Sequence, residues 1–498
     1  MKKFFLLIVV STMMILQAYA GGLVSNTNQS ASYYRMLARG ASTSGDAVYF
    51  NPAGLAFLEN GLTVSLNTQM IWMERTLNND FPGLKKFMDP SNPSAPPRTG
   101  EFVGNLFVPV FPGVYVAYKK NNVTLSLGFN PPAGGGSIEF DKGIPMLEAP
   151  ISAIKLAMPL ITDYRMDAMM KGSSIVYGVQ VGASYRINEM LGFSAGVRMM
   201  FASNSYEGYL RDIKINPQHP QLNPNNTMIP ATNFFAAMGN GLAAQAEQAA
   251  LAGDAATAAF LTEKATEMMI NSAKTSDKEL NASQKGSGIA PIVGLHFSTG
   301  KLNLAAKYEF KTTITLTNEP TKDDLNMYPK TEKPRSDVPA LLSLAGSYDI
   351  VPALRFSFTY IHHFEKQAEI ETWESEPTPA NPLNGKIEKR QNFIDCGTNE
   401  YMAGLEWKLN DKLIISAGCQ YSDVSVKDDW QNDITHHLDN FTLGLGAAYH
   451  FSDRLTLNIG GLNTWYNTVS KDEKKPIPYT QTYDRTNKAI ALGIDFRF

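Results

Sequence analysis

Residues 488–498 alternate between two kinds of side chain without a break. A period of two places successive side chains on opposite faces of a β-strand. One face is apolar and consists of Ile490, Leu492, Ile494, Phe496 and Phe498. The other face is small or charged and consists of Ala489, Ala491, Gly493, Asp495 and Arg497. Strands of soluble sandwiches also alternate, but an apolar row that runs to the last residue is more typical of the closing strand of a transmembrane β-barrel.

The first twenty residues are typical of an export signal. Lys2 and Lys3 precede an apolar run over 4–16, and the small residues Ala18 and Ala20 follow it. This order predicts a cleaved secretory signal peptide over 1–20. The alternative is a membrane anchor, but the run is shorter than the ~20 residues that a spanning helix needs. We therefore expect a bacterial outer-membrane protein whose mature chain begins near Gly21.

The composition excludes further classes of protein. Beyond the signal no apolar run reaches the length of a transmembrane helix, which excludes a helical inner-membrane protein. A net charge of -3 gives no reason to expect a nucleic-acid partner. If 410–411 is a tight turn, the cysteines Cys396 and Cys419 are about six residues out of register, or ~20 Å apart. We expect both thiols to be unpaired.

Alternating runs come in pairs that are joined by very short turns. The turns lie at 119–122, 188–189, 299–300, 349–352, 410–411 and 452–453. Six hairpins, a first strand over 62–75 and the terminal strand give about fourteen strands, and an even number places both ends in the periplasm. The expected fold is all-β: an antiparallel transmembrane β-barrel over 61–498, with an N-terminal hatch and helical insertions in its extracellular loops.

Long segments separate the pairs, and we expect them on the extracellular side. They are 77–100, 131–172, 212–285, 317–335, 371–396, 427–437 and 470–485. Two of them, 131–172 and 212–285, are expected to be partly helical. Helices are predicted over 231–251 and 254–274, with Asp254 as an N-cap, and over 151–170, with a break at Pro159. Their apolar and Met-rich faces either cover one another as a cap or bind varied apolar ligands.

Residues 21–60 do not alternate and are rich in small residues. They end in a tight turn, Asn51-Pro52-Ala53, and an apolar stretch before the first strand. A barrel of about fourteen strands has a wide lumen unless something fills it. This segment is therefore predicted to be a compact hatch that plugs the barrel.

These residues resemble the FadL-type outer-membrane transporters of long-chain fatty acids and other hydrophobic compounds. The resemblance rests on Gln29-Ser30-Ala31, on Arg39-Gly40-Ala41 before Asp46-Ala47, on the Asn51-Pro52-Ala53 motif and on the terminal Phe498. The Ala-rich insertion at 233–274 and the Pro-rich outer loops depart from the family pattern and leave ligand choice open.

The resemblance implies a passive channel. Outer loops capture a long-chain fatty acid or similar ligand, which passes through the plugged lumen and leaves sideways into the outer leaflet, keeping the acyl chain out of water. It also implies a monomer in contact with outer-membrane lipid and lipopolysaccharide, assembled by the barrel assembly machinery through Phe498.

A gap in the wall needs a strand that stops hydrogen bonding. The third strand, 123–129, runs into a stretch of two prolines and three glycines, which remove donors and stiffness. The resemblance places the family's lateral opening in this strand. The alternative is an ordinary loop start. The candidate residues are Asn130, Pro131, Pro132, Gly134, Gly135 and Gly136.

Candidate ligand contacts follow from charge and apolar spacing. Alternation places Arg198 and Lys307 on the lumen face, where a cation suits a carboxylate head group, unless these charges pair across the lumen or with the hatch. Phe234, Phe235, Met238 and Leu242 are candidates for an outer capture groove.

No catalytic or metal-binding constellation emerges from the sequence. The pairs His362-His363 and His436-His437 are adjacent in sequence, and neighbours on a strand face opposite ways. We expect no enzyme activity and no cofactor. Passive uptake of a hydrophobic ligand is the leading hypothesis, and a general polar porin and an adhesin or scaffold acting through its loops are the alternatives. The sequence leaves the ligand and any periplasmic acceptor unidentified.

Overall fold

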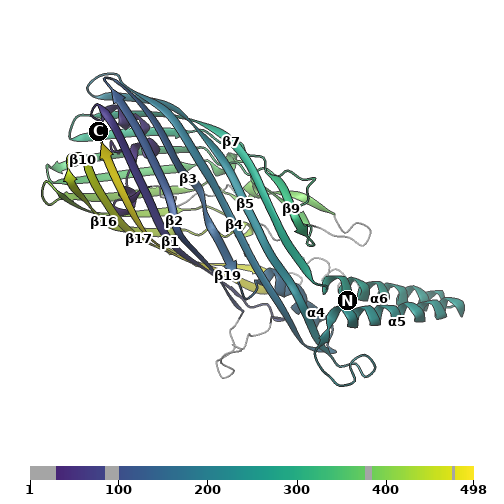
Figure 1. Ribbon diagram of the computed structural model, residues 1–498. Coiled ribbons are helices and arrows are strands. Elements are labelled where there is room, and N and C mark those ends of the chain that lie inside the picture. Colours follow the sequence, from purple (N-terminus) through teal and green to yellow (C-terminus); the bar gives the residue numbers. More distant parts are fainter. Residues whose placement is uncertain (1–29, 85–99, 376–383, 474–476) are drawn as a thin grey trace.

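The computed structural model describes residues 30–84, 100–375, 384–473 and 477–498. The expected signal peptide and Gln29 lie outside the described residues. The chain is a closed antiparallel β-barrel of 14 strands (Figure 1), as the sequence predicts. Pairing of the first strand with the last, from Thr63 opposite Arg497 to Asn79 opposite Gln481, closes the barrel.

The barrel strands follow one another around the wall in chain order. They are β1 (Gly61–Asn79), β2 (Glu101–Lys120), β3 (Val123–Phe140), β4 (Ile161–Arg186), β5 (Leu191–Pro217), β7 (Lys278–Ser298), β8 (Leu302–Glu309), β10 (Leu341–Val351), β11 (Leu354–His363), β14 (Asn399–Lys408), β15 (Leu413–Asp423), β16 (Asn440–Ser452), β17 (Leu455–Tyr466) and β19 (Tyr479–Arg497). Short pieces extend the wall: β6 (Ile229–Pro230) beside β5, β9 (Thr317–Asp323) beside β7, and β18 (Val469–Glu473) beside β19. A separate hairpin consists of β12 (Glu371–Ser375) and β13 (Gly385–Lys389).

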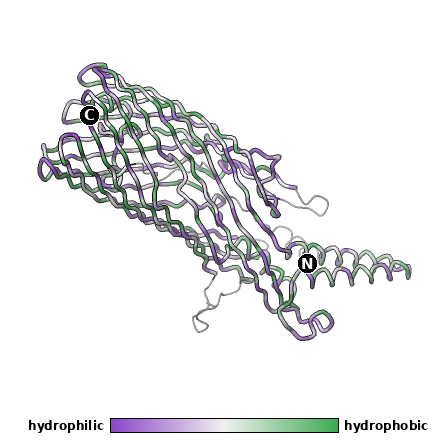
Figure 2. The backbone as a smooth tube through the Cα atoms, in the orientation of Figure 1, coloured by the Kyte–Doolittle hydropathy of each residue, from purple (hydrophilic) through white to green (hydrophobic). Residues whose placement is uncertain are grey.

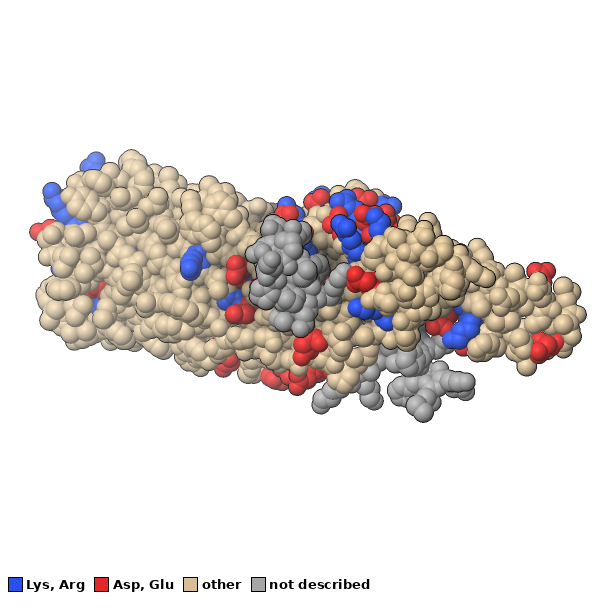
Figure 3. Space-filling model, turned by 90° about the horizontal axis from the view of Figure 1, so that it is seen from below, with Lys and Arg blue, Asp and Glu red and all other residues tan. Residues whose placement is uncertain are grey.

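The alternation in the sequence sets the two faces of the wall. On β1 the polar Ser65, Asn67 and Gln69 are buried in the lumen, while Leu66 and Trp72 are exposed on the outside. Hydropathy alternates along the strands accordingly (Figure 2). Over much of the wall the outer surface carries few charges (Figure 3). This is the surface that a strand of period two presents to lipid.

Loop length is segregated by end, as predicted. The six hairpin turns and the C-terminus lie at one end of the barrel, and the helices of the long loops lie at the other (Figure 1). Helices α5 (Ala231–Leu251) and α6 (Ala255–Lys274) form a protruding hairpin at the positions that the sequence predicts. Asp254 caps α6 by accepting a hydrogen bond from the Thr257 N–H at 3.0 Å. Among the described helices, none combines the length and the apolar character that spanning a membrane requires.

Three expectations for the outer end are wrong. The wall extends into the expected loop 131–172 from both sides, because β3 continues to Phe140 and β4 begins at Ile161. The helix predicted over 151–170 is instead α4 (Pro145–Ala157), with Pro150 inside it, followed by strand. The expected loop 470–485 is largely strand in β18 and β19. Apolar residues at 161–170 fit helical and strand spacing alike, and the long-range pairing with β5 decides between them.

Candidate functional site: the plugged lumen and the break in the wall

A hatch made of α2 (Ala31–Arg35), α3 (Ala47–Phe50) and the 3-10 helix η1 (Pro52–Phe57) fills the lumen. Inward-facing glycines of the wall form its seat. A Cβ on Gly460 would lie 2.6 Å from the Arg35 nitrogen, and one on Gly418 would lie 2.6 Å from the Leu37 nitrogen. Since glycine has no Cβ, the hatch backbone lies directly against the wall.

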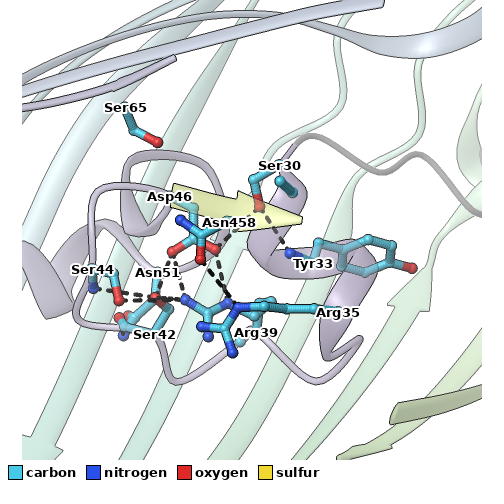
Figure 4. A network of polar contacts seen from close by, with 12 residues as sticks. Ser30, Tyr33, Arg35, Arg39, Ser42, Ser44, Asp46, Asn51, Ser65 and Asn458 are labelled. Atoms are coloured by element: carbon cyan, nitrogen blue, oxygen red, sulfur yellow. Dashed lines mark hydrogen bonds and ion pairs between the residues drawn. The ribbon is translucent and has the colours of Figure 1, made fainter. Parts of the chain in front are cut away.

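A buried polar network holds the hatch together (Figure 4). The Arg39 guanidinium forms two hydrogen bonds with Asp46, and the Ser42 hydroxyl donates to Asp46 Oδ1 at 2.6 Å. From α2, Arg35 reaches the wall, where its NH1 donates to Glu406 Oε1 at 2.6 Å. The network therefore ties the hatch to itself and to β14.

The predicted hatch motif lies at the centre of this plug. Asn51 Nδ2 donates to the Ser42 carbonyl at 2.9 Å and lies 2.9 Å from Nδ1 of His296 on β7. Pro52 occupies the first turn of η1, where its missing N–H costs nothing. Ala53 is fully buried, and a Cβ on Gly294 of β7 would lie 3.6 Å from its Cβ. The motif thus places the hatch against β7.

Side chains of the wall satisfy carbonyl groups of the hatch. Gln180 of β4 donates to the Val48 carbonyl at 2.5 Å, and Ser184 donates to the Pro52 carbonyl at 2.7 Å. Lys307 of β8 donates to the Tyr49 carbonyl at 3.0 Å. Gln180 and Ser184 lie on β4, the neighbour of the irregular third strand.

The ladder between β2 and β3 is interrupted. The two strands pair from Lys120 opposite Val123 up to Val114 opposite Phe129, and then again only at Asn105 opposite Glu139. The predicted opening residues lie inside this interval. They are therefore part of β3 itself and not the start of a loop.

The backbone of β3 bends at the same place. Its register with β4 shifts between Asn130 and Ala133 and again between Gly134 and Gly136. Residues 130–133 are all buried, so alternation stops and the strand turns into the lumen. Gly134 and Gly136 have φ values of 78° and 105°, which favour glycine. Gly135 has neither a positive φ nor a neighbour within 4 Å of a Cβ placed there.

A small cavity of about 60 Å³ lies between the hatch and this bend. Its lining includes Tyr49 of the hatch, Pro132 of the bend, and both predicted head-group contacts, Arg198 and Lys307. The two cations lie over the Tyr49 ring, 4.7 and 5.0 Å from its centroid. A cavity of ~150 Å³ is needed to hold benzene, so this one is closed to an acyl chain as it stands.

Both cations already have protein partners. Arg198 NH1 forms an ion pair with Glu309, and its NH2 donates to Gln180 Oε1 at 2.6 Å. Lys307 Nζ lies 4.0 Å from Glu309 Oε2 in addition to its bond to the hatch. The alternative that these charges pair with other protein groups therefore describes the structure: Arg198 pairs along the wall with Glu309, and Lys307 bonds to the hatch.

The four predicted groove residues lie at the base of the helical hairpin. Phe234 and Phe235 are 2% and 0% exposed, and their rings contact each other edge to face. Met238 and Leu242 are half-buried against the same cluster. Phe234 and Phe235 therefore form a packed floor beneath the hairpin, which differs from the open groove that the sequence suggests.

That floor belongs to one contiguous apolar cluster. The cluster runs from the hairpin through the outer half of the lumen to the hatch. Its members include Phe235, Leu210, Met170, Phe140, Leu106, Phe111, Phe50 and Leu37.

The other end of the plugged lumen is polar. A cavity of about 420 Å³ lies between the hatch and the short-turn end of the barrel. Charged side chains line much of it, including Arg35, Arg355, Glu406, Lys408 and Asp495.

Comparison with solved structures identifies the fold. A crystal structure of a Pseudomonas aeruginosa FadL homologue superposes with a TM-score of 0.62 at 13% sequence identity, covering 96% of this chain and 100% of that chain. This chain has the FadL-type fold. The P. putida toluene transporter TodX superposes with a TM-score of 0.51 at 13% identity, covering 92% of this chain and 95% of that chain. No family model and no curated protein matches the sequence.

Some features of the site have a local sequence signature, and others do not. The Asn51 turn and the Pro-Gly stretch are local motifs, and they lie in the hatch and in β3 respectively. The glycines against which the hatch packs have no comparable sequence signature, because Gly418 and Gly460 look like ordinary inward positions of alternating strands. The sequence also gives no sign of the role of Tyr49, whose ring lies under both cations, because only the folded hatch brings it to the wall.

Proposed function

We propose that the protein is a passive outer-membrane channel for hydrophobic compounds. Ligand enters through the outer cap, which consists of α4, the α5–α6 hairpin and the loop 424–439. It then follows the apolar cluster and leaves sideways between β2 and β3 into the outer leaflet. The observation that carries this proposal is the interrupted β2–β3 ladder with the bend at 130–136. A missing stretch of ladder is a weak point in a wall that otherwise needs every backbone hydrogen bond.

The chemistry of the two ends of the lumen supports a sideways exit. Apolar side chains form a contiguous cluster from the cap to the hatch, whereas the cavity beyond the hatch is lined by charged groups. Moving an acyl chain into the charged cavity would expose it to polar groups and water, at ~25 cal/mol for each Å² of apolar surface. The break in the wall leads to a surface on which Phe107, Val110 and Phe129 are exposed, so an apolar ligand stays in apolar surroundings.

The proposed ligands are long-chain fatty acids or compounds of similar hydrophobicity. The fold supports this class, because the solved structures that share it include a FadL homologue and a toluene transporter. We also propose that the protein is exported, embeds in outer-membrane lipid beneath lipopolysaccharide, and acts as a monomer without enzymatic activity. Phe498 is the proposed recognition point for barrel assembly.

Uptake of labelled oleate into proteoliposomes tests the proposal. The test variant replaces Pro131, Pro132, Gly134 and Gly136 with Thr or Val, which restores donors and strand preference. We expect saturable uptake by the native protein and its loss in this variant. The matched control is Gly135→Ser, which adds a side chain in open space and should retain uptake.

Folding is checked by the heat-dependent mobility shift of each barrel on a denaturing gel. Uptake by a folded break-closing variant at the native rate would contradict lateral release. Absence of uptake by the native protein, together with steady ion current in planar bilayers, would favour the porin alternative.

A further inference from the structure

Two arginines face each other directly on the inner wall of the barrel. Arg75 of β1 is the register partner of Arg485 of β19, and both occupy inward positions of their strands. Like charges directly opposite on neighbouring strands destabilise a sheet. Two arginines in one register pair therefore destabilise the sheet unless an anion neutralises them.

No carboxylate of the described residues compensates this pair. Each guanidinium has a buried Nε without a hydrogen-bond partner among the described groups. Arg75 NH1 donates to the Ile434 carbonyl, and the Arg485 guanidinium lies 4.8 Å from the centroid of the Tyr466 ring. This differs from Arg198, whose charge Glu309 neutralises.

Two buried ionisable groups of the outer cap, Asp433 and His436, do not supply the missing charge. Among the described residues Asp433 forms no ion pair with Arg75 or Arg485, and its carboxylate accepts hydrogen bonds from Gln481 and from the Met146 N–H instead, at 2.7 Å for the latter. His436 is fully buried, and burial followed by the charges of Arg75 and Arg485 holds its pKa well below the ordinary value. It is therefore a neutral neighbour of the two cations.

The surroundings of the pair are apolar. Leu77, Leu438 and Tyr483 are all at most 3% exposed and belong to the cluster that runs from the cap to the hatch. Met73 and Tyr466 pack against the same cluster. A ligand that meets both guanidiniums thus has apolar side chains around the rest of its body.

We propose that Arg75 and Arg485 form an anion subsite that binds the carboxylate of a hydrophobic acid on its way through the outer half of the lumen. Two guanidinium forks suit the two oxygens of one carboxylate, and the apolar cluster takes the chain. This inference rests on the proposed function and narrows its ligand class to acids over neutral hydrocarbons.

Equilibrium binding to the purified full-length protein in a neutral detergent tests the subsite. The probes are oleate, oleyl alcohol, which lacks the charge, and acetate, which lacks the chain. The double variant R75M/R485M keeps much of the side-chain bulk and removes both charges. We expect its oleate affinity to fall about 30-fold or more, because two charge-assisted bonds are lost. Oleyl alcohol binding should stay unchanged, and acetate should bind far more weakly than oleate.

Two further variants separate charge from structure. R75K/R485K keeps both charges but loses the fork geometry, so its oleate affinity should lie between those of the native protein and the Met variant. R211M removes an exposed outer arginine that pairs with Asp167, and it should bind oleate normally. Without ligand, R485M should unfold at a higher temperature than the native barrel, because the like-charge contact is relieved.

The inference is overturned if R75M/R485M binds oleate as the native protein does, if acid and alcohol lose affinity equally, or if acetate matches oleate. Each of these results leaves the proposed function standing, provided that the native protein takes up oleate into proteoliposomes. Failure of native uptake for oleate and toluene alike is the separate result that would reject the channel itself.

Discussion

Arg39 and Asp46 form a two-pronged ion pair inside the hatch, with Nε to Oδ2 at 2.8 Å and NH2 to Oδ1 at 2.9 Å. Both residues are buried, and the pair joins the segment after α2 to the start of α3. A parallel pair of charge-assisted bonds fixes orientation as well as distance. The hatch therefore holds its own shape and does not depend on the wall alone.

Asp46→Asn is expected to loosen the plug. The substitution keeps the size of the side chain but leaves Arg39, among the described residues, with Glu406 as its one remaining ion-pair partner, 3.9 Å from its NH1. Breaking a buried pair costs about 3–5 kcal/mol. Ion conductance in planar bilayers should rise above the native level, whereas Asp167→Asn, at an exposed pair on the wall, should leave it unchanged. A native-like current through folded Asp46→Asn would show that the pair does not hold the plug.

Gly460→Val should unseat the hatch while the barrel still forms. A Cβ at this position meets the Arg35 nitrogen at 2.6 Å and the Tyr34 Cβ at 2.7 Å. The expected readout is rapid trypsin cleavage at Arg35 and Arg39, which are buried in the native protein. Gly461→Val is the matched control, since the neighbouring position has only an ordinary contact at 3.7 Å. Equal resistance of the two variants would contradict the role of the seat.

Local patterns made the wall predictable. A period of two identifies a strand from its own residues, and a hairpin needs only a short turn between two such runs. The predictions of the six turns and of the terminal strand are therefore confirmed. The helical hairpin was also local, because Asp254 caps α6 within its own first turn.

Long-range contacts were not predictable in the same way. Arg198 lies on β5 and its partner Glu309 on β8, and the sequence shows only that both face the lumen. The sequence predicts a loop over 470–485, so it does not indicate that Arg485 pairs with Arg75. The helical spacing of Phe234 and Phe235 is compatible both with an open groove and with a packed floor. Only the packing beneath the hairpin distinguishes the two.

A disulfide between the hatch and the wall should block uptake. The pair Ala53→Cys and Gly294→Cys places two Cβ atoms 3.6 Å apart, within the disulfide range of ~3.5–4.5 Å. The Ser194 hydroxyl, 2.8 Å from the new Cβ, has to rotate aside. Because the cavity at the bend is about 60 Å³, passage of an acyl chain requires the hatch to move. We therefore expect little oleate uptake in the oxidised protein and recovery after reduction.

The Ala53→Cys and Gly294→Cys pair is introduced into a Cys396→Ser, Cys419→Ser background, because both native thiols are free. Ala53→Cys alone in this background controls for the substitution and should be indifferent to oxidation. Equal uptake by the oxidised and reduced forms of the double variant would mean that ligand passes a stationary hatch.

Docking of the outer cap should weaken as the pH rises. Burial, opposed by hydrogen bonds from Gln481 and Met146, raises the pKa of the Asp433 carboxyl from 3.8 to about 6. An undocked cap returns this group to its ordinary value, so the docked form binds the proton more tightly. The stabilisation is complete below about pH 4 and is lost as the pH passes through about 6, amounting to at most about 3 kcal/mol. Amide exchange across 424–439, corrected for intrinsic rates, should show stronger protection at pH 5 than at pH 8. Asp433→Asn carries no charge at either pH and should remove the difference, while equal protection of the native cap at both pH values would exclude Asp433 as its cause.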